Sequence, residues 1–322
     1  MKGSSVCQRV LAGPGSRLVL IVWVAVWAAC VSPAEGQNAA RYAAPDTVCT
    51  LSDKRIVEAS GIVASRHTPH VYYVHNDSGG EPRVFVVDRR GRTRAVIVLA
   101  GARNVDWEDI ALAPGKRAGA FDICVADIGD NAARRAEVVI YRFPEPELPK
   151  AIGGKLTVKP HALRLRYPGG SRNAEALVVH PLTGDAYILS KRTDGACRVF
   201  RCPKPWRSDR VVELESAGEL RRGRAAPIAT MVTGADLSRD GRRLVVRTYR
   251  CGWEWTLPSG ASPRDFAALI RTEPALVELA AEPQGEAICY SAAGDALLTV
   301  SEITPTDLNE CRVTNVEKPA KP

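Results

Sequence analysis

Residues 106–113 read DWEDIALA and place acidic side chains at the start of a short apolar run. Four other stretches share that arrangement: EASGIVAS (58–65), NAEALVVH (173–180), VTGADLSRDG (232–241) and QGEAICYSAAG (284–294). The acids at positions 58, 108, 175, 236 and 286 are 50, 67, 61 and 50 residues apart. Units of strands and turns that recur at a spacing of this size are typical of propellers and solenoids.

The residues after each acid form short apolar runs bounded by Gly, Pro, Asp or Asn, which indicates strands and turns. The first unit shows this at 71–77 (VYYVHND), 83–91 (RVFVVDRRG) and 93–101 (TRAVIVLAG). Helical periodicity is scarce. We therefore predict an all-β fold, a β-propeller of four-stranded antiparallel blades. Five blades are favoured, and six are the alternative because the interval between 108 and 175 is long enough to contain another blade.

A closed ring of blades needs its two ends joined. Residues 47–51 precede the first repeat, and we expect them to supply the strand that the last unit lacks. A disulfide between Cys49 and Cys311 is one way to lock this closure. Seven cysteines follow residue 36, and an odd number leaves at least one thiol free.

The N-terminal residues have the pattern of an export signal: three basic residues, an apolar run over 18–31, and small residues before a cleavage site at Gly36. We expect a signal peptide over 1–36, a flexible leader over 37–46, a single propeller domain over 47–316 and a disordered tail over 317–322. Cleavage would leave the protein periplasmic or extracellular. The alternatives are an uncleaved anchor and a lipoprotein attached through Cys30.

The chain of 322 residues carries a net charge of +8, which falls to +6 once the first 36 residues are removed. Its basic residues cluster near glycine turns and no aromatic residues interleave with them, so we expect no nucleic-acid partner. No later stretch is apolar enough to span a bilayer, so we expect no membrane insertion of the mature chain. We expect a monomer whose partner is a small anionic ligand or substrate.

The repeated acids predict a metal site. The first strand of a propeller blade lines the central channel, so acids at that place in each unit should converge. The expected metal ligands are Glu58, Asp106, Glu108, Asp127, Glu175, Asp236 and Glu286. Carboxylate oxygens suit Ca²⁺, which is the expected cofactor. Acids crowded together without a cation would raise one another's pKa, so either a cation or the basic rim residues Lys191, Arg192 and Arg247 should neutralise them.

The ends of the second strands supply further candidates. HNDSG (75–79) and DIGDN (127–131) end the second strand of the first two units. The candidate catalytic residues are His75, Asp77 and Asp130, and the candidate ligand-binding residues are Asn76, Asn131, Lys191, Arg192 and Arg247. An alternative interpretation is that Asp and Asn at these places hold turns through side-chain hydrogen bonds.

These motifs resemble those of a family of exported bacterial β-propellers of uncharacterised function. The resemblance lies in Glu58–Gly61 (E-x-SG), His75–Gly79 (HNDSG), Asp106–Ala111 (DWEDIA) and Asp127–Asn131 (DIGDN). More distantly, the pattern is similar to SdiA-regulated YjiK-like propellers and to calcium-dependent propeller phytases and lactonases. The resemblance implies the fold and a site centred on the channel. It implies no particular activity, and the characteristic phytase segments are absent.

Two functions fit this sequence. The chain has no GxSxG elbow, phosphate-binding loop, HExxH or dinucleotide motif. The favoured function is therefore an exported binding or scaffold propeller with an acid-lined channel and a polar rim, which binds a cation or a small anionic ligand. The alternative is a Ca²⁺-dependent hydrolase of phosphate esters or lactones, in which basic rim residues stabilise developing negative charge.

Overall fold

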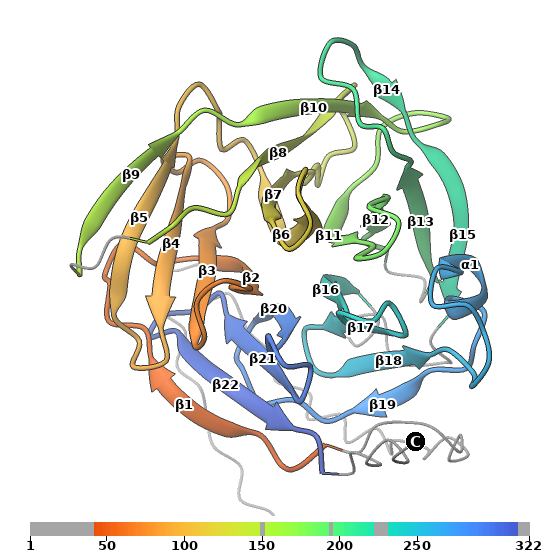
Figure 1. The fold of residues 1–322 in the computed structure, drawn as a ribbon. Coiled ribbons are helices and arrows are strands. Elements are labelled where there is room, and N and C mark those ends of the chain that lie inside the picture. The colour runs from red at the N-terminus through yellow and green to blue at the C-terminus, as the bar shows by residue number, and fades with distance from the viewer. Residues whose placement is uncertain (1–41, 149–151, 193–195, 222–230, 315–322) are drawn as a thin grey trace, which may run out of the picture. The chain divides into compact units, whose positions relative to one another are not determined.

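The computed structural model describes residues 42–148, 152–192, 196–221 and 231–314, and their strands form five sheets around a central axis (Figure 1). Blade 1 contains β2 (Ala59–Ala64), β3 (Val71–Asn76), β4 (Arg83–Asp88), β5 (Thr93–Leu99) and β9 (Gly154–Val158). Blade 2 contains β6 (Trp107–Pro114), β7 (Phe121–Asp127), β8 (Val138–Pro144), β10 (His161–Arg166) and β14 (Val212–Glu213). Blade 3 contains β11 (Ala174–Val179), β12 (Ala186–Ser190), β13 (Ala196–Cys202) and β15 (Glu215–Arg221).

The two remaining blades have four strands each. Blade 4 contains β16 (Val232–Leu237), β17 (Arg243–Thr248), β18 (Gly252–Thr256) and β19 (Ala275–Val277). Blade 5 contains β20 (Gly285–Tyr290), β21 (Ala296–Ser301), β22 (Asp307–Arg312) and β1 (Asp46–Thr50). The first strands β2, β6, β11, β16 and β20 each contact the next around the axis, so the ring is closed. The prediction of a five-bladed β-propeller is confirmed.

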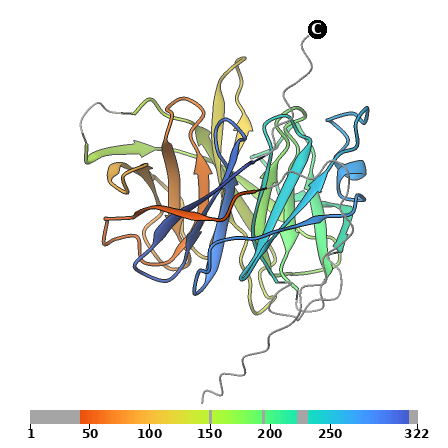
Figure 2. The ribbon, with the colours of Figure 1, turned by 90° about the horizontal axis from the view of Figure 1, so that it is seen from below.

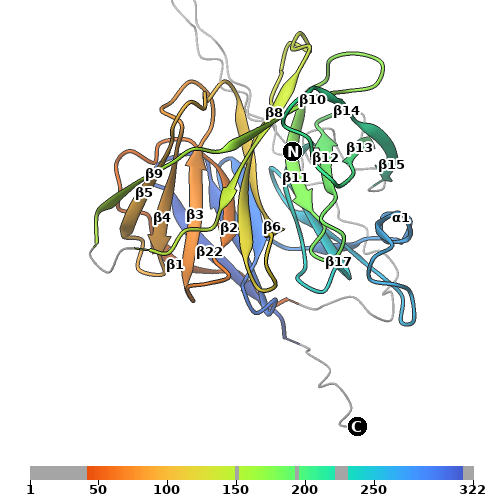
Figure 3. The ribbon, with the colours of Figure 1, turned by 45° about the horizontal axis from the view of Figure 1, so that its top comes forward.

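The long interval between the second and third repeats holds an exchanged strand and no sixth blade. After β8 the chain crosses to blade 1, where β9 pairs in parallel with β5 (Figure 3). It then returns as β10 to complete the antiparallel part of blade 2. A short strand from the next unit, β14, pairs in parallel with β10. These exchanges cover the outer edges of blades 1 and 2, where unpaired strands would otherwise lie open to other chains.

The N-terminal strand closes the propeller as predicted. β1 pairs antiparallel with the C-terminal strand β22, and the two lie side by side in Figures 1 and 2. The Cys49–Cys311 disulfide, named above as one way to lock the closure, is absent, because both thiols are free. Register explains this: Cys49 lies opposite Leu308, whereas the Cys311 Sγ lies 3.7 Å from the backbone oxygen of Glu278. Backbone pairing and side-chain hydrogen bonds, such as that from Thr47 to Asn309 at 2.8 Å, therefore fasten the ring without a disulfide.

Five clusters of buried apolar side chains lie between neighbouring blades. Trp107 belongs to the cluster between blades 1 and 2, is fully buried, and donates its indole N–H to the backbone oxygen of Arg103 at 2.9 Å. The helix α1 (Phe266–Leu269) adds to the cluster between blades 3 and 4, where Phe266 stacks on Tyr187 with 3.8 Å between ring centroids. Burial of one such side chain contributes about 1.5–3 kcal/mol.

Several expectations concern residues outside the described ranges. These are the signal peptide, Cys30, residues 37–41 of the leader and the C-terminal tail. Within the described ranges, none of the helices has the length and apolar character needed to cross a bilayer.

Candidate functional site

Every innermost strand carries a register shift of one residue near its start. The shifts fall at Ser60, Glu108, Glu175, Thr233 and Glu286. A β-bulge re-aims the side chain of the extra residue, and bulges are common beside functional sites. The five residues are therefore structurally equivalent, and they mark the mouth of the channel.

The five bulge residues are of two kinds, hydroxyl residues that bond the neighbouring inner strand and buried glutamates. The Ser60 hydroxyl donates to the backbone oxygen of Glu108 at 2.8 Å, and the Thr233 hydroxyl donates to that of Gly285 at 2.9 Å. In blades 1 and 4 the bulge side chain thus ties one inner strand to the next. In blades 2, 3 and 5 the bulge residue is a buried glutamate, namely Glu108, Glu175 and Glu286.

The residue after each second strand forms the neighbouring layer of the mouth. In blades 1, 3, 4 and 5 these residues are Asp77, Lys191, Tyr249 and Glu302. The backbone N–H groups of Asp77, Lys191 and Glu302 donate across the sheet to the residue two places before the bulge, at 2.8–3.1 Å. This shared pairing places the side chains of Asp77, Lys191 and Glu302 at one level.

Three carboxylates gather on the blade 1 and blade 2 side of the mouth. Asp77, Asp106 and Glu108 each have a carboxylate oxygen within 4.8 Å of the others. Oδ1 of Asp77 is buried and has no hydrogen-bond partner in the described part of the chain. In that described part of the chain, none of the carboxylates of Asp77, Asp106 and Glu108 makes an ion pair. This group is called the carboxylate cluster below.

Gly129 of the DIGDN segment lies directly against the carboxylate cluster. A Cβ at this position would come within 2.5 Å of Asp106 Oδ2 and even closer to Glu108 Oε1. Only glycine lets the backbone approach two carboxylates so closely. The DIGDN segment therefore contributes to the site because Gly129 has no side chain to keep the carboxylates away.

The carboxylate cluster favours protonation when no cation is present. The pKa of Asp77 is raised to about 7, first by burial and then by the carboxylates of Asp106 and Glu302. Burial, followed by repulsion from Glu175 and Asp77, holds the pKa of Glu108 well above its usual range. Burial also raises the pKa of Asp106, although Arg135 opposes the shift. Each shift records the free-energy cost of negative charge in a desolvated acidic site.

A lysine occupies the blade 3 and blade 4 side of the mouth. Lys191 Nζ lies 3.1 Å from Glu175 Oε1 and donates to the Tyr249 hydroxyl at 2.9 Å. Burial alone would lower the pKa of Lys191, but Glu175 and Tyr249 raise it overall. The pKa of Glu286 is raised to about 9 by burial and then by Glu175. Lys191 therefore remains charged among these glutamates.

Two amides orient the glutamates. Asn173 Nδ2 donates to Glu175 Oε1 at 3.0 Å, and Gln284 Nε2 donates to Glu286 Oε1 at 3.2 Å. Both amides lie two residues before their bulge glutamate. Gln284 also contacts Glu302, so it links the two layers of blade 5.

The carboxylates of Asp127 and Asp130 accept hydrogen bonds from nearby backbone amides. Asp127 accepts the amides of Val105 and Asp106 at 3.2 Å and pairs with Arg135 at 2.7 Å. Asp130 accepts the amides of Arg134 and Arg135 at 2.9 and 2.7 Å. These contacts match the alternative interpretation in which aspartates hold turns.

His75 and Arg247 occupy equivalent, fully buried positions one residue before the end of the second strand. Nδ1 of His75 is 2.9 Å from the backbone oxygen of Asn76, the ring packs edge-on against Trp107, and burial lowers its pKa to about 4. Arg247 pairs with Glu282 at 2.8 Å. Both side chains thus lie between blades and away from the rim.

Asp236 lies three residues beyond the bulge of its strand, so it does not join the carboxylate cluster. It accepts the amides of Leu237 and Tyr290, at 2.8 and 2.9 Å, and burial raises its pKa to about 6. Asp109, which was not predicted as a site residue, does the same for Ile110 and Leu177. Each aspartate clamps the first strands of neighbouring blades together.

The remaining predicted residues lie around the mouth. Asn76 binds the backbone of Arg55 and Val57, and the exposed Asn131 accepts a hydrogen bond from Asn173. Arg192 is half-buried directly after Lys191. Glu58 is exposed and acts electrostatically on Asp77 and Glu302.

Tyr249 and Glu302 lie at strand ends that the repeat predicts to face the rim, and with Gln284 they belong to the mouth, although none of the three was chosen as a candidate catalytic, ligand-binding or metal-binding residue. The signal for Tyr249 and Glu302 is their place directly after a second strand, which they share with Asp77 and Lys191. The residue that directly follows each second strand is identified only from the strand register in the structure.

No protein-family model and no curated protein match the chain. Among solved structures, it is similar to a PQQ-bound aldose sugar dehydrogenase from Streptomyces coelicolor, with a TM-score of 0.48 and 12% identity over 85% of this chain and 99% of that chain. It is also similar to a gluconolactonase from Xanthomonas campestris, with a TM-score of 0.43 and 12% identity over 79% of this chain and 72% of that chain. Likenesses this distant carry no argument about function.

Proposed function

We propose that this protein is an exported binding propeller whose channel mouth holds a divalent cation, Ca²⁺ first of all, and with it a small anionic ligand. The observation that carries the proposal is the carboxylate cluster of Asp77, Asp106 and Glu108, with oxygens within 4.8 Å of one another. Export is supported by the pattern of the first 36 residues.

The donor set fits Ca²⁺. This ion takes six to eight oxygen ligands at about 2.3–2.6 Å in flexible geometry, and carboxylates are its usual protein ligands. The buried, unpartnered Oδ1 of Asp77 is an independent sign that a donor or cation belongs at this place. A cation there would neutralise the three carboxylates, as Lys191 does for Glu175.

Lys191 gives the mouth a second positive centre. It is half-buried and held in place by Glu175 and Tyr249. A cation at the carboxylate cluster and an ammonium group at the same mouth would together attract an anion. This arrangement supports a small carboxylate or phosphate compound as the ligand.

Calorimetric titration with Ca²⁺ and Mg²⁺, together with thermal unfolding in EDTA, tests the proposal. Saturation at 100 times Kd should stabilise the fold by about 2.7 kcal/mol. Binding should also release protons, because metal ligands must be deprotonated and the pKa of Asp77 is about 7. The Asp106→Asn and Glu108→Gln variants should lose both effects. Glu81→Gln, which removes an exposed carboxylate paired with Arg83, is the control. Unfolding that is indifferent to Ca²⁺ and EDTA contradicts the proposal.

A metal-dependent hydrolase of phosphate esters or lactones is the second candidate. The observation that favours it is Lys191, a fixed ammonium group at the same mouth as the carboxylate cluster, where it would stabilise developing negative charge. Bound Ca²⁺ would supply Lewis-acid chemistry. Assays with a phosphomonoester, a phosphodiester and a lactone, each with Ca²⁺ or EDTA, separate the two functions. Turnover that requires Ca²⁺ and is lost in Lys191→Met identifies the hydrolase.

A further inference from the structure

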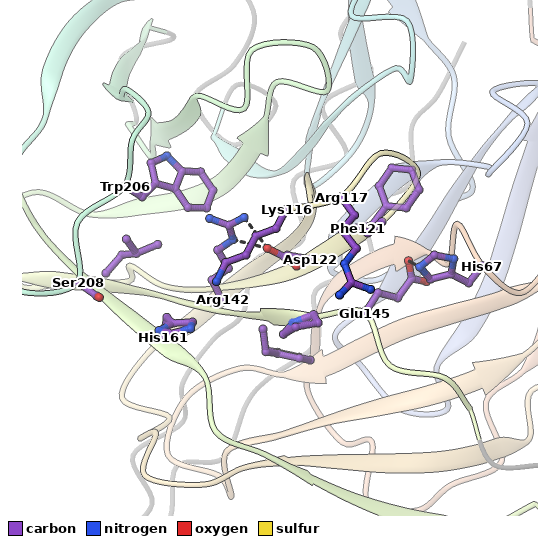
Figure 4. A pocket seen from close by; sticks show the side chains of 14 residues that line it. His67, Lys116, Arg117, Phe121, Asp122, Arg142, Glu145, His161, Trp206 and Ser208 are labelled. Atoms are coloured by element: carbon purple, nitrogen blue, oxygen red, sulfur yellow. Dashed lines mark hydrogen bonds and ion pairs between the residues drawn. The ribbon is translucent and has the colours of Figure 1, made fainter.

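A cleft with a different chemical character lies at the other end of blade 2. β6 runs from the mouth to Pro114, and Pro114 pairs with Phe121 at the start of β7. The cleft is built around this far end and has a volume of about 550 Å³ (Figure 4). Volumes of this size are usual for small-molecule sites.

Three blades contribute to the cleft. Blade 2 supplies the β6–β7 turn with Lys116 and Arg117, and the end of β8. Blade 1 supplies His67 from the β2–β3 turn, and Trp206 comes from the segment that follows β13 in blade 3. Walls drawn from several rigid sheets make a preformed site.

Arg142 is fixed in the wall of the cleft. Its Nε donates to Asp122 Oδ2 at 2.6 Å, and its guanidinium lies 4.8 Å from the centre of the Trp206 ring. Figure 4 shows Arg142 and Asp122 joined beside Lys116. Asp122 neutralises the charge of Arg142, so this arginine contributes a rigid, flat surface and spare N–H donors.

Lys116 and Arg117 supply charge that remains unbalanced. Both are exposed, and in the described part of the chain neither forms an ion pair with a carboxylate. These two cations make this end of the blade positive, in contrast to the acidic mouth. An anion is the complementary ligand.

Aromatic side chains form much of the remaining wall. Phe121 packs edge-on against His67 with 5.8 Å between ring centroids. The buried carboxylate of Glu145, held by Ser65 at 2.6 Å, lies 3.6 Å from His67 Nε2 and positions that imidazole. His161 and Trp206 line the cleft beyond Arg142 (Figure 4). Flat rings bind well among such faces.

We propose that this cleft binds a small organic anion built on a ring, with its carboxylate or phosphate at Lys116 and Arg117 and its ring among Phe121, His161 and Trp206. The site is separate from the carboxylate cluster and does not depend on the function proposed for the mouth.

Calorimetric titration of the full mature protein tests this proposal with five probes. Benzoate, phenyl phosphate and glucuronate combine a ring with an anion, whereas benzyl alcohol lacks the charge and inorganic phosphate lacks the ring. We expect saturable binding of at least one of the first three and weaker binding of the last two. Comparison of benzoate with glucuronate then separates aromatic from sugar rings, and comparison with phenyl phosphate separates carboxylate from phosphate.

The double variant Lys116→Gln/Arg117→Gln should weaken that binding by about tenfold or more, because charge-assisted hydrogen bonds are lost. The matched control is Lys54→Gln/Arg239→Gln, which removes two exposed cations elsewhere and should leave binding unchanged. Glu108→Gln should also leave it unchanged. The proposal is overturned if no ring-bearing anion binds up to millimolar concentration, if inorganic phosphate binds as well as phenyl phosphate, or if the two double variants behave alike.

Discussion

Lys191 and Glu175 form the central ion pair of the channel mouth, with 3.1 Å between Nζ and Oε1. Their side chains are only 15% and 4% exposed, so water screens the pair little. Glu175 also repels Glu108 and Glu286 and raises the pKa of both. The lysine therefore offsets repulsion among several glutamates as well as its direct partner.

Replacement of Lys191 by methionine should destabilise the protein by about 3 kcal/mol or more at pH 8, because a buried charge is left without its partner. The double variant Lys191→Met/Glu175→Gln should recover most of that loss. Urea unfolding measures both effects, and Lys54→Met is the control for loss of an exposed lysine. Equal destabilisation of the single and double variants would contradict this account of the pair.

The stability of the metal-free protein should fall as the pH rises. Glu286 has its pKa raised to about 9 by burial and by Glu175, so the folded state holds a proton that the unfolded chain releases near pH 4.5. A raised carboxyl pKa contributes stability that is complete below pH 4.5 and is lost as the pH rises through 9.

Urea unfolding in EDTA at pH 5, 7 and 9 checks this dependence. Glu286→Gln removes the proton-linked contribution. The free energy of unfolding should therefore decline less between pH 7 and pH 9 than in the wild type. If the wild type and Glu286→Gln show the same pH dependence, then Glu286 does not hold its proton in the folded protein.

Substitution of Gly129 by alanine should remove cation binding while the fold survives. The added methyl group would press on Glu108 and Asp106, and overpacking of this kind costs about 1–3 kcal/mol. The carboxylates must then move apart. Gly80→Ala is the matched control, because the nearest atom to a Cβ there is 3.8 Å away. Calorimetry with Ca²⁺ should show weaker binding only for the Gly129 variant, and unchanged binding in both would remove Gly129 from the site.

The repeat of acids was sufficient to predict the propeller and much of its mouth. Glu108, Glu175 and Glu286 share one bulge position, and their spacing in the sequence reflects it. The same reasoning placed Asp236 in that set, although Thr233 occupies the bulge of its strand. A stretch such as VTGADL contains no signal that tells which of its residues forms the bulge, and Asp236 is the only acid in it.

The sequence did not predict which side chains near a strand end reach the mouth, and the reason here is different. Residues two apart on a strand point to the same face, but this rule ends where the strand ends, and Asp77 and Tyr249 lie just beyond β3 and β17. His75 and Asp77 are two residues apart and Arg247 and Tyr249 likewise, yet in each pair only the second residue reaches the mouth. The exchange of β9 into blade 1 depends on a distant partner, β5, that local residue patterns do not specify.

Asp109 should be among the residues most important for stability, although it lies outside the predicted site. Its buried carboxyl group accepts the amides of Ile110 and Leu177 at 2.8 and 2.9 Å and so joins β6 to β11. Asp109→Ala leaves these buried amides without an acceptor, at a cost of about 1–3 kcal/mol each. Asp109→Asn keeps one oxygen and should cost less. Urea unfolding of both variants beside Asp209→Ala, which removes an exposed carboxylate, measures the difference. A loss in Asp109→Ala no larger than that of Asp209→Ala would show that the two inner strands hold together without this clamp.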